Sequence, residues 1–328
     1  MKRRLGASTV HPVGLGCMSL SHAYGVPPAR EDAVRLLNAA LDLGYDHLDT
    51  AALYGFGANE TLIGEAIAHR RDEYFLASKC GMTGVDGKRV IDGRPETLRQ
   101  TIDEALTRLK TDRIDLYYLH RWDKSVPIEE SVGELARMVE AGKILSIGLS
   151  EVSAATLHRA HAVHPIAAVQ NEYSLWSRNV ELGVLDATRE LGAALVAFSP
   201  VARGFLAGGV PSLDVLPEKD IRRFMPRFQP DNFTRNQQLL TLLRDTAARL
   251  DLTPAQLCLQ WLFTRGAHVV AIPGTTSPAH LAENFAAPAA RLPDHVVTTL
   301  DEAFANDRIA GHRYPAATLA EIDTEEFA

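Results

Sequence analysis

Short apolar runs alternate with longer amphipathic segments through most of this chain. In the longer segments the apolar residues recur every three or four positions, which is the spacing of one helix face. Eight runs have the length and composition of buried strands, and they cover residues 13–20, 45–51, 74–81, 114–120, 144–150, 167–173, 194–201 and 268–275. Buried strands separated by helices pair in parallel, because a parallel connection needs a long crossover. Eight such units predict a (β/α)8 TIM barrel rather than an open sheet.

Local signals agree with the helices of this pattern, which cover residues 30–43, 60–69, 95–109, 128–141, 153–163 and 179–191. Pro95 and Pro254 stand in first turns, where the missing N–H costs nothing. Gly44, Gly142 and Gly192 stand where a helix must end in a left-handed residue before the next strand.

Four segments fall outside the alternation. Residues 1–13 predict an N-terminal β-hairpin, and residues 84–93 predict a polar loop after the third strand. Residues 207–236 form an irregular, proline-containing insertion after the seventh strand, and residues 306–328 form a C-terminal tail. Loops that follow the strands build the active-site face of such a barrel, so both loop segments are expected beside a site.

Length and composition narrow the classes of function. A chain of 328 residues allows two small domains, but a barrel of this size is commonly one, and we expect a single domain over residues 1–328. The composition is 46% hydrophobic and the net charge is −7, with no dense cluster of Lys and Arg, so a nucleic-acid partner is not expected. No apolar run is long enough to span a membrane.

The cysteines and the N-terminus indicate a cytoplasmic protein without a metal. Cys17, Cys80 and Cys258 are far apart and lack the CxxC spacing of a zinc site, so we expect reduced thiols. Polar residues follow the basic start of the chain where a signal peptide needs an apolar region. We therefore expect neither a disulfide framework nor secretion.

Polar residues gather at the ends of the expected strands, as the barrel hypothesis requires. They are Asp49, Ser78, Lys79, His120, Arg121, Ser150, Glu151, Gln170, Asn171, Glu172, Ser199, Pro200, Gly274, Thr275 and Thr276. Because all strands of a parallel barrel end at the same face, these side chains are expected around one mouth.

Four of the residues near the strand ends suggest acid–base chemistry. Asp49 would be costly in a core unless a cation paired with it, and Lys79 on the next strand is the natural partner. Tyr54 would lie above this pair, where an ammonium stabilises phenolate and eases release of the proton. A neutral His120 could donate a hydrogen bond to a carbonyl oxygen.

Each of these residues also has a purely structural explanation. Asp49 and Lys79 could be a structural ion pair, Tyr54 could pack against the barrel, and His120 could cap its strand through a backbone hydrogen bond. The four coincide at or just after consecutive strand ends, and packing alone does not require that. The catalytic interpretation is therefore favoured.

Longer motifs resemble one family. The run 44–51 followed by Tyr54, the pair Ser78-Lys79 and the strand 114–120 ending in His120 are similar to the aldo-keto reductases over essentially the whole chain. Residues 170–176 and the Pro-Arg-Phe at 226–228 most resemble the pyridoxal-reductase-like and auxin-induced-type branch. The resemblance implies a (β/α)8 barrel without a Rossmann domain and a nicotinamide cofactor extended across the barrel mouth.

The resemblance also implies roles for individual residues. Asp49, Tyr54, Lys79 and His120 correspond to the catalytic tetrad, with Tyr54 as the general acid in the reduction of an aldehyde or ketone by NAD(P)H. Ser150, Gln170 and Asn171 would hold the carboxamide, and Tyr173 would stack on the nicotinamide ring. The remaining cofactor contacts would come from Ser199, Pro200, Val201, Arg203, Gly204, Leu206, Gly274, Thr275, Thr276, His280, Glu283 and Asn284.

One departure bears on the choice of cofactor. NADPH-preferring members of the family commonly carry Arg or Lys just after the Pro-Gly-Thr of the eighth strand, and residues 273–280 contain neither. Hydroxyl groups, amides at a helix start and His280 could receive a 2′-phosphate instead. We expect NADPH, with NADH as the second possibility.

The substrate is less determined than the cofactor. Tyr24, Phe56, Trp122 and Trp176 could form an apolar cup for a small carbonyl compound, and each could equally be ordinary packing. Residues 207–236 are expected to fold over the cofactor.

Other functions fit the sequence less well. A Schiff-base aldolase would need a neutral lysine, and Lys79 beside Asp49 should stay protonated. A metal-dependent hydrolase needs clustered ligands, and no His-x-His occurs. A cofactor-binding regulatory or redox-sensing subunit with little turnover remains the main alternative, since some members of the family serve potassium channels in that way.

Overall fold

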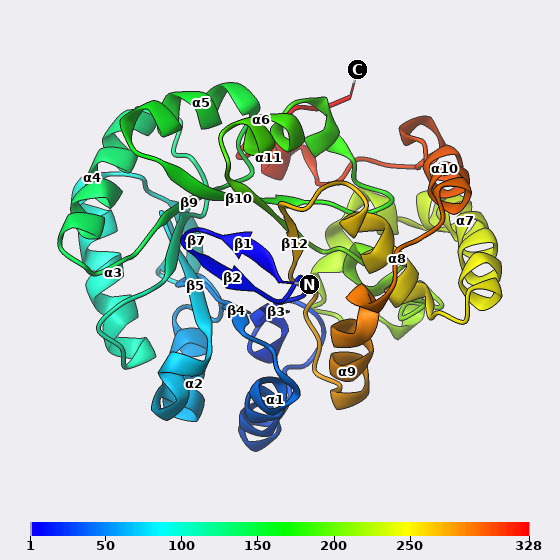
Figure 1. Cartoon of the computed structure of the whole chain (residues 1–328), viewed down its shortest axis with the longest axis horizontal. Coiled ribbons are helices and arrows are strands. Elements are labelled where there is room, and N and C mark those ends of the chain that lie inside the picture. Colours follow the sequence, from blue (N-terminus) through cyan, green and yellow to red (C-terminus); the bar gives the residue numbers. More distant parts are fainter. Residues whose placement is uncertain (1, 328) are drawn as a thin grey trace.

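A closed barrel of parallel strands forms the centre of the computed structural model, which describes residues 2–327 (Figure 1). The strands are β3 (Leu15–Gly16), β4 (His47–Asp49), β5 (Phe75–Cys80), β8 (Leu116–Leu119), β9 (Ile147–Ser150), β10 (Ile166–Glu172), β11 (Ala194–Phe198) and β12 (Val269–Ala271). Parallel bridges join Val13 to Ala271 and Gly16 to Gly274, so the first strand segment meets the last. The predicted (β/α)8 barrel is confirmed.

Successive side chains of each strand point alternately into the barrel and out toward the helices, so the protein has an inner and an outer hydrophobic core. One set of side chains fills the barrel interior and includes Ala77, Leu116, Tyr118, Ala168, Ala194, Val196 and Val270. The intervening residues, such as Leu76, Tyr117 and Val169, belong to the larger core outside the strands. Because successive residues of a strand point to opposite faces, the inward set also decides which side chains reach the mouth of the barrel.

A hairpin closes the end of the barrel at which the parallel strands begin. β1 (Arg3–Leu5) pairs antiparallel with β2 (Ser8–Val10), and Figure 1 shows both strands across the middle of the ring. Leu5 and Val10 pack with the interior core residues. The hairpin expected within residues 1–13 is therefore present and fills the floor of the barrel.

Helices surround the strands, as Figure 1 shows. They are α1 (Arg30–Leu43), α2 (Ala58–Ile67), α3 (Pro95–Leu109), α4 (Ile128–Glu140), α5 (Ala154–Val163), α6 (Val184–Glu190), α8 (Pro254–Phe263) and α9 (Pro278–Ala286). The expected proline starts of α3 and α8 are confirmed, and Thr253 and Gln256 form a capping box on α8. Gly44 has a φ of 106° at the end of α1, which a residue with a Cβ adopts only with strain.

Three segments differ from their expected form. The expected polar loop at 84–93 is largely a second hairpin, β6 (Met82–Val85) with β7 (Lys88–Ile91). The insertion 207–236 contains short 3₁₀ turns, but its last seven residues already belong to the long helix α7 (Pro230–Arg249). The helix expected over 179–191 is interrupted at Gly183, with a 3₁₀ turn before it and α6 after it.

The C-terminal region adds α10 (Asp294–Ala303) and α11 (Ala316–Leu319) beyond the barrel units. Within residues 2–327, no helix combines the length and hydrophobicity that a membrane crossing requires. The same part of the chain contains no group of three or more His, Cys, Asp or Glu residues arranged to hold a metal ion. All three cysteines are buried and unpaired.

Candidate active site

A buried ion pair lies at the carboxyl end of the barrel. Asp49 ends β4 and Lys79 lies on β5, and each is about 1% exposed. Lys79 Nζ donates to Asp49 Oδ1 and, at 2.7 Å, to the carbonyl oxygen of Thr50. The amide of Gln170 donates to the second carboxylate oxygen of Asp49 at 2.7 Å. Each charge therefore has the hydrogen bonds that make its burial tolerable.

Tyr54 stands beside the lysine. It lies in the turn between β4 and α2, and Lys79 Nζ is 3.3 Å from its hydroxyl oxygen. Burial raises the pKa of Tyr54 above its ordinary value, and the ammonium of Lys79 opposes that rise without cancelling it. Lys79 therefore acts in the expected direction, because its ammonium lowers the pKa of Tyr54, but removal of water has the larger effect. Tyr54 is a protonated phenol at neutral pH.

His120 completes this group on the other side. It follows β8, its ring lies edge-on to Tyr54 with 6.0 Å between centroids, and its backbone N–H donates to Cys80 O at 2.8 Å. Burial, with Arg121, Lys79 and Arg89 nearby, holds the pKa of His120 well below its usual range. The imidazole is therefore neutral at pH 7 and retains an N–H to donate.

These groups open into a cavity of about 920 Å³ at the carboxyl end of the strands. Asp49, Tyr54 and His120 line it, whereas Lys79 lies beneath. Expected cofactor residues that line it are Ser150, Gln170, Ser199, Pro200, Val201, Arg203, Gly204, Gly274, Thr275, Thr276, His280, Glu283 and Asn284. The volume lies at the upper end of the range of about 300–1,000 Å³ for ligand pockets.

Three expected cofactor residues lie elsewhere, and their positions correct the sequence-based assignment. Asn171 is fully buried and donates to Thr324 Oγ1 at 3.1 Å. Tyr173 is also fully buried, with its hydroxyl 2.7 Å from Glu181 and its ring against Trp261 of α8. Leu206 belongs to the outer core. Asn171 and Tyr173 alternate with Gln170 along the chain and therefore face the helices instead of the mouth.

Three of the four expected substrate-pocket residues are also misplaced. Phe56 is 56% exposed and covers Gly84 of β6. The Trp122 indole N–H donates to Val126 O at 2.9 Å, and its ring packs on the core outside the cavity. Trp176 is buried against Phe205, with 4.7 Å between ring centroids. Tyr24 is the one that lines the cavity.

Phe198, Met82 and Arg89 also line the cavity, although the sequence did not predict them there. Phe198 ends β11 and lines the cavity, and it has the same inward parity as Val196. That parity was a signal available in the sequence. Met82 and Arg89 come from the unexpected hairpin β6–β7. No periodic pattern points to these two residues.

The insertion forms one wall of the cavity. Ile221, Arg222, Phe224 and Met225 line it, and the N–H of Ile221 donates to Ala23 O at 3.1 Å in the loop after β3. Arg222 pairs with the buried Asp220 at 2.7 Å and donates to Arg203 O at 3.0 Å. The insertion therefore reaches across the mouth to the opposite loop.

A second buried pair lies under the insertion. Arg203 donates to Glu172 at 3.0 Å and to the hydroxyl groups of Tyr24 and Tyr314, each also at 3.0 Å. Arg203 has a positive φ of 58°. Its side chain is therefore held rigidly at the edge of the cavity by three oxygens from different segments.

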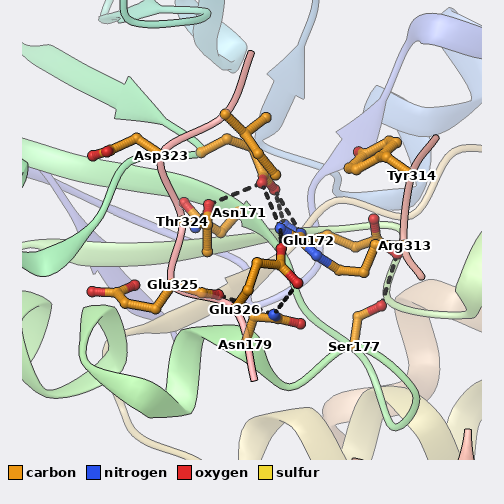
Figure 2. Close-up of polar contacts among 12 residues, drawn as sticks. Asn171, Glu172, Ser177, Asn179, Arg313, Tyr314, Asp323, Thr324, Glu325 and Glu326 are labelled. Carbon is orange, nitrogen blue, oxygen red and sulfur yellow. Dashed lines mark hydrogen bonds and ion pairs between the residues drawn. The ribbon is translucent and has the colours of Figure 1, made fainter. Parts of the chain in front are cut away.

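Polar contacts fix the C-terminal tail to residues at and beyond the strand ends, and Figure 2 shows these contacts. Arg313 donates to Glu151 at 3.1 and 3.3 Å, and Thr324 donates to the same carboxylate at 2.9 Å. Asn179 donates to Glu325 O at 3.0 Å. These contacts hold the tail across the mouth, where Tyr314, Pro315 and Thr318 line the cavity.

Comparison with known proteins identifies the class. The sequence profile of the aldo/keto reductase family matches residues 12–305. The aldo-keto reductase yakc [NADP(+)] of Schizosaccharomyces pombe is 42% identical over 327 residues, covering 98% of this chain and 96% of that protein. The probable aldo-keto reductase 1 of Glycine max is 41% identical over 308 residues, covering 93% and 88%.

Solved structures agree with the sequence relatives. The glycerol dehydrogenase AKR11B4 from Gluconobacter oxydans superposes with a TM-score of 0.86 at 27% identity, covering 96% of this chain and 98% of that one. The aldo-keto reductase AKR11C1 from Bacillus halodurans gives a TM-score of 0.76 at 29% identity, covering 93% and 96%. The fold and site thus define a barrel oxidoreductase, and this chain belongs to the aldo/keto reductase family.

Proposed function

We propose that this protein reduces aldehydes or ketones to alcohols, with NADPH as the hydride donor and Tyr54 as the proton donor. The observation that carries the proposal is the hydroxyl of Tyr54, which lies 3.3 Å from the buried Lys79 and opens into the same cavity as a neutral His120. The name of the Schizosaccharomyces pombe relative specifies NADP(+), which supports the choice of cofactor.

The cavity residues fit an extended dinucleotide. Ser150 and Gln170 present polar side chains near Tyr54, and Phe198 offers an aromatic face for the nicotinamide in place of Tyr173. Arg203 and Arg222, which are paired with Glu172 and Asp220, also line the cavity and could donate to the pyrophosphate. At the far end, α9 begins after Ser277, and its N-terminal amides favour a phosphate beside Thr275 and His280. We propose that residues 207–236 cover the cofactor.

The chain's own residues supply the acid and the polarising groups. NADPH supplies the hydride when it is bound. Because burial raises its pKa, Tyr54 carries the proton that carbonyl reduction consumes. Lys79 stabilises the phenolate that remains, and Asp49 holds Lys79 in its charged form. A neutral His120 donates a hydrogen bond that orients the carbonyl oxygen and stabilises its developing charge.

Steady-state oxidation of NADPH by 4-nitrobenzaldehyde tests the proposal. Tyr54→Phe should lower kcat by a factor of about 10²–10⁴, which is the usual contribution of a general acid. The Kd for NADPH, from quenching of tryptophan fluorescence, should change little, because the ring remains. Tyr45→Phe is a matched control, since the Tyr45 hydroxyl donates to Leu281 O at 2.9 Å outside the cavity.

Two results would count against this function. Near-normal turnover by Tyr54→Phe would remove Tyr54 from the acid role. Tight NADPH binding by the unaltered protein without turnover of any aldehyde in a panel would favour the cofactor-sensing alternative. A parallel titration with NADH decides which nucleotide the site prefers.

A further inference from the structure

Arg121 is a buried cation that the proposed reduction does not use. It follows His120 at the end of β8, is 8% exposed and lines the cavity. Its hydrogen bonds to the described residues all run from Nη1, to His120 O at 2.7 Å and to Ser150 Oγ at 3.3 Å. Its Nε is buried without an acceptor in the described part of the chain. The guanidinium is therefore only partly satisfied.

No carboxylate among residues 2–327 pairs with Arg121. The Arg121 charge does act on Glu151, where it helps to lower the pKa. Glu151 is already bound by Arg313 and Thr324, and by the N–H of Glu172 at 2.8 Å. A buried cation without a counter-ion is costly. Two other buried arginines, Arg203 and Arg313, have a carboxylate partner, and the buried Arg227 donates to Trp176 O, Ser177 Oγ and Gly311 O instead.

The position of Arg121 places this cation at the catalytic end of the cavity. It touches Ser150 on β9 and neighbours His120, whose pKa it helps to lower. Arg89 of the β6–β7 hairpin also lines this part of the wall, and it pairs with Glu321 of the tail. An anion entering beside Tyr54 would meet a positive charge that no carboxylate of residues 2–327 pairs directly.

We propose that Arg121 binds an oxyanion of the substrate, so that the preferred carbonyl compounds carry a carboxylate or phosphate group. This inference rests on the proposed reductase function and adds the substrate class to it. Charge-assisted hydrogen bonds from a guanidinium are short and geometrically selective for such groups. The free N–H groups of Arg121 supply them without disturbing its bonds to His120 O and Ser150.

Three benzaldehydes of similar shape test the proposal. They carry at the 4-position a carboxylate, the methyl ester of that carboxylate, or a phosphate ester. The measured quantity is the ratio of kcat/KM for each anionic aldehyde to kcat/KM for the neutral ester. This ratio should favour an anion in the unaltered protein and should fall as NaCl screens the charge. A larger ratio for the carboxylate or for the phosphate identifies which oxyanion the site prefers.

Arg121→Met should lower the acid-to-ester ratio by about 10- to 100-fold, or ~1.4–2.8 kcal/mol at 1.4 kcal/mol per factor of ten. Arg121→Lys keeps the charge and should lie between the two. Arg291→Met removes an equal charge from a position that is 82% exposed on its side chain, and should leave the ratio unchanged. Thermal unfolding of each variant establishes that it is folded.

Separate readouts distinguish failure of this inference from failure of the reductase function. Equal acid-to-ester ratios of kcat/KM for the unaltered protein and Arg121→Met would overturn the proposal that Arg121 binds a substrate oxyanion. A raised Kd for NADPH in Arg121→Met with an unchanged ratio would assign Arg121 to the cofactor and also overturn it. If no aldehyde is turned over, calorimetric binding of terephthalate to the NADP⁺ complex decides: binding lost in Arg121→Met supports the anion site, and binding retained refutes it.

Discussion

Replacing Asp49 by Asn tests the buried ion pair that underlies the site. The substitution keeps the shape of the side chain and an oxygen that can accept from Lys79, but it removes the negative charge that faces this ammonium, which is about 1% exposed. Removing one partner of a buried pair leaves an uncompensated charge and typically costs about 3–5 kcal/mol. We expect a loss of that size in the free energy of unfolding at pH 7.

The pH dependence gives this prediction its sign. Burial opposes the charge of Lys79, but Asp49 and Tyr54 hold its pKa above the ordinary value. In the unaltered protein, this contribution to stability is complete below the unfolded pKa of about 10.4 and is lost as pH rises through the folded pKa. In Asp49→Asn burial dominates and the Lys79 pKa falls, so the deficit of the variant should shrink as pH rises toward about 10.4.

Urea unfolding at a series of pH values measures the effect. The double variant Asp49→Asn with Lys79→Met should recover much of the loss, because it removes both charges. Asp103→Asn breaks an exposed pair with Lys143 and should cost about 0–1 kcal/mol. A loss below about 1 kcal/mol that does not vary with pH would refute the account of Lys79 as a charge held by Asp49.

Three further predictions concern other parts of the site. Because the pKa of His120 is well below its usual range, the pH profile of kcat/KM should show no inflection near pH 6.5. An inflection there that disappears in His120→Gln would contradict a neutral His120. Arg313→Met leaves Glu151 buried and unpaired and should cost about 3–5 kcal/mol in urea unfolding at neutral pH. Burial opposes the charge of Glu151, but Arg313 and its other partners hold its pKa below the ordinary value. The deficit should therefore shrink as acid protonates Glu151 and be lost well below about pH 4.3; a constant deficit would argue for lost packing instead. Shortening residues 211–219 should raise the Kd for NADPH about tenfold, or ~1.4 kcal/mol, and an unchanged Kd in fluorescence titration would exclude a covering role.

The barrel could be predicted from the sequence because each of its strands and helices has a signal within its own residues. Each strand is a short apolar run, each helix has one apolar face, and Gly44 and Pro254 mark ends that physical constraints make recognisable. The convergence of Asp49, Lys79 and His120 followed from the same pattern, since parallel strands end at one face.

Side-chain parity explains the errors within the cofactor site. Ala168 and Gln170 point inward, so Asn171 and Tyr173 must point to the helices. The same alternation brings Phe198 to the mouth. Polar residues at a strand end therefore indicate that this end lies at the site. Whether a residue has the same parity as the inward-pointing residues of its strand indicates whether its side chain faces the ligand.

The loops and the tail could not be placed from the sequence. The tip of the β6–β7 hairpin is glycine-rich and charged, which is also the composition of an open loop. Trp176 is buried and Trp122 half-buried, through contacts with residues distant in sequence, and aromatic character alone does not distinguish core from pocket. The tail is held by long-range polar contacts such as Arg313 with Glu151, which leave no periodic signal.

The most direct test of the central claim is the fate of the hydrogen at C4 of the nicotinamide. The two forms of NADPH that carry deuterium in one or the other configuration at C4 are each oxidised with 4-nitrobenzaldehyde, and the alcohol is analysed by mass spectrometry. We predict that one form transfers deuterium to the carbinol carbon and the other does not, and that Tyr54→Phe slows both reactions. An alcohol without deuterium from either form, or no alcohol at all from the unaltered protein, would contradict hydride transfer at this site.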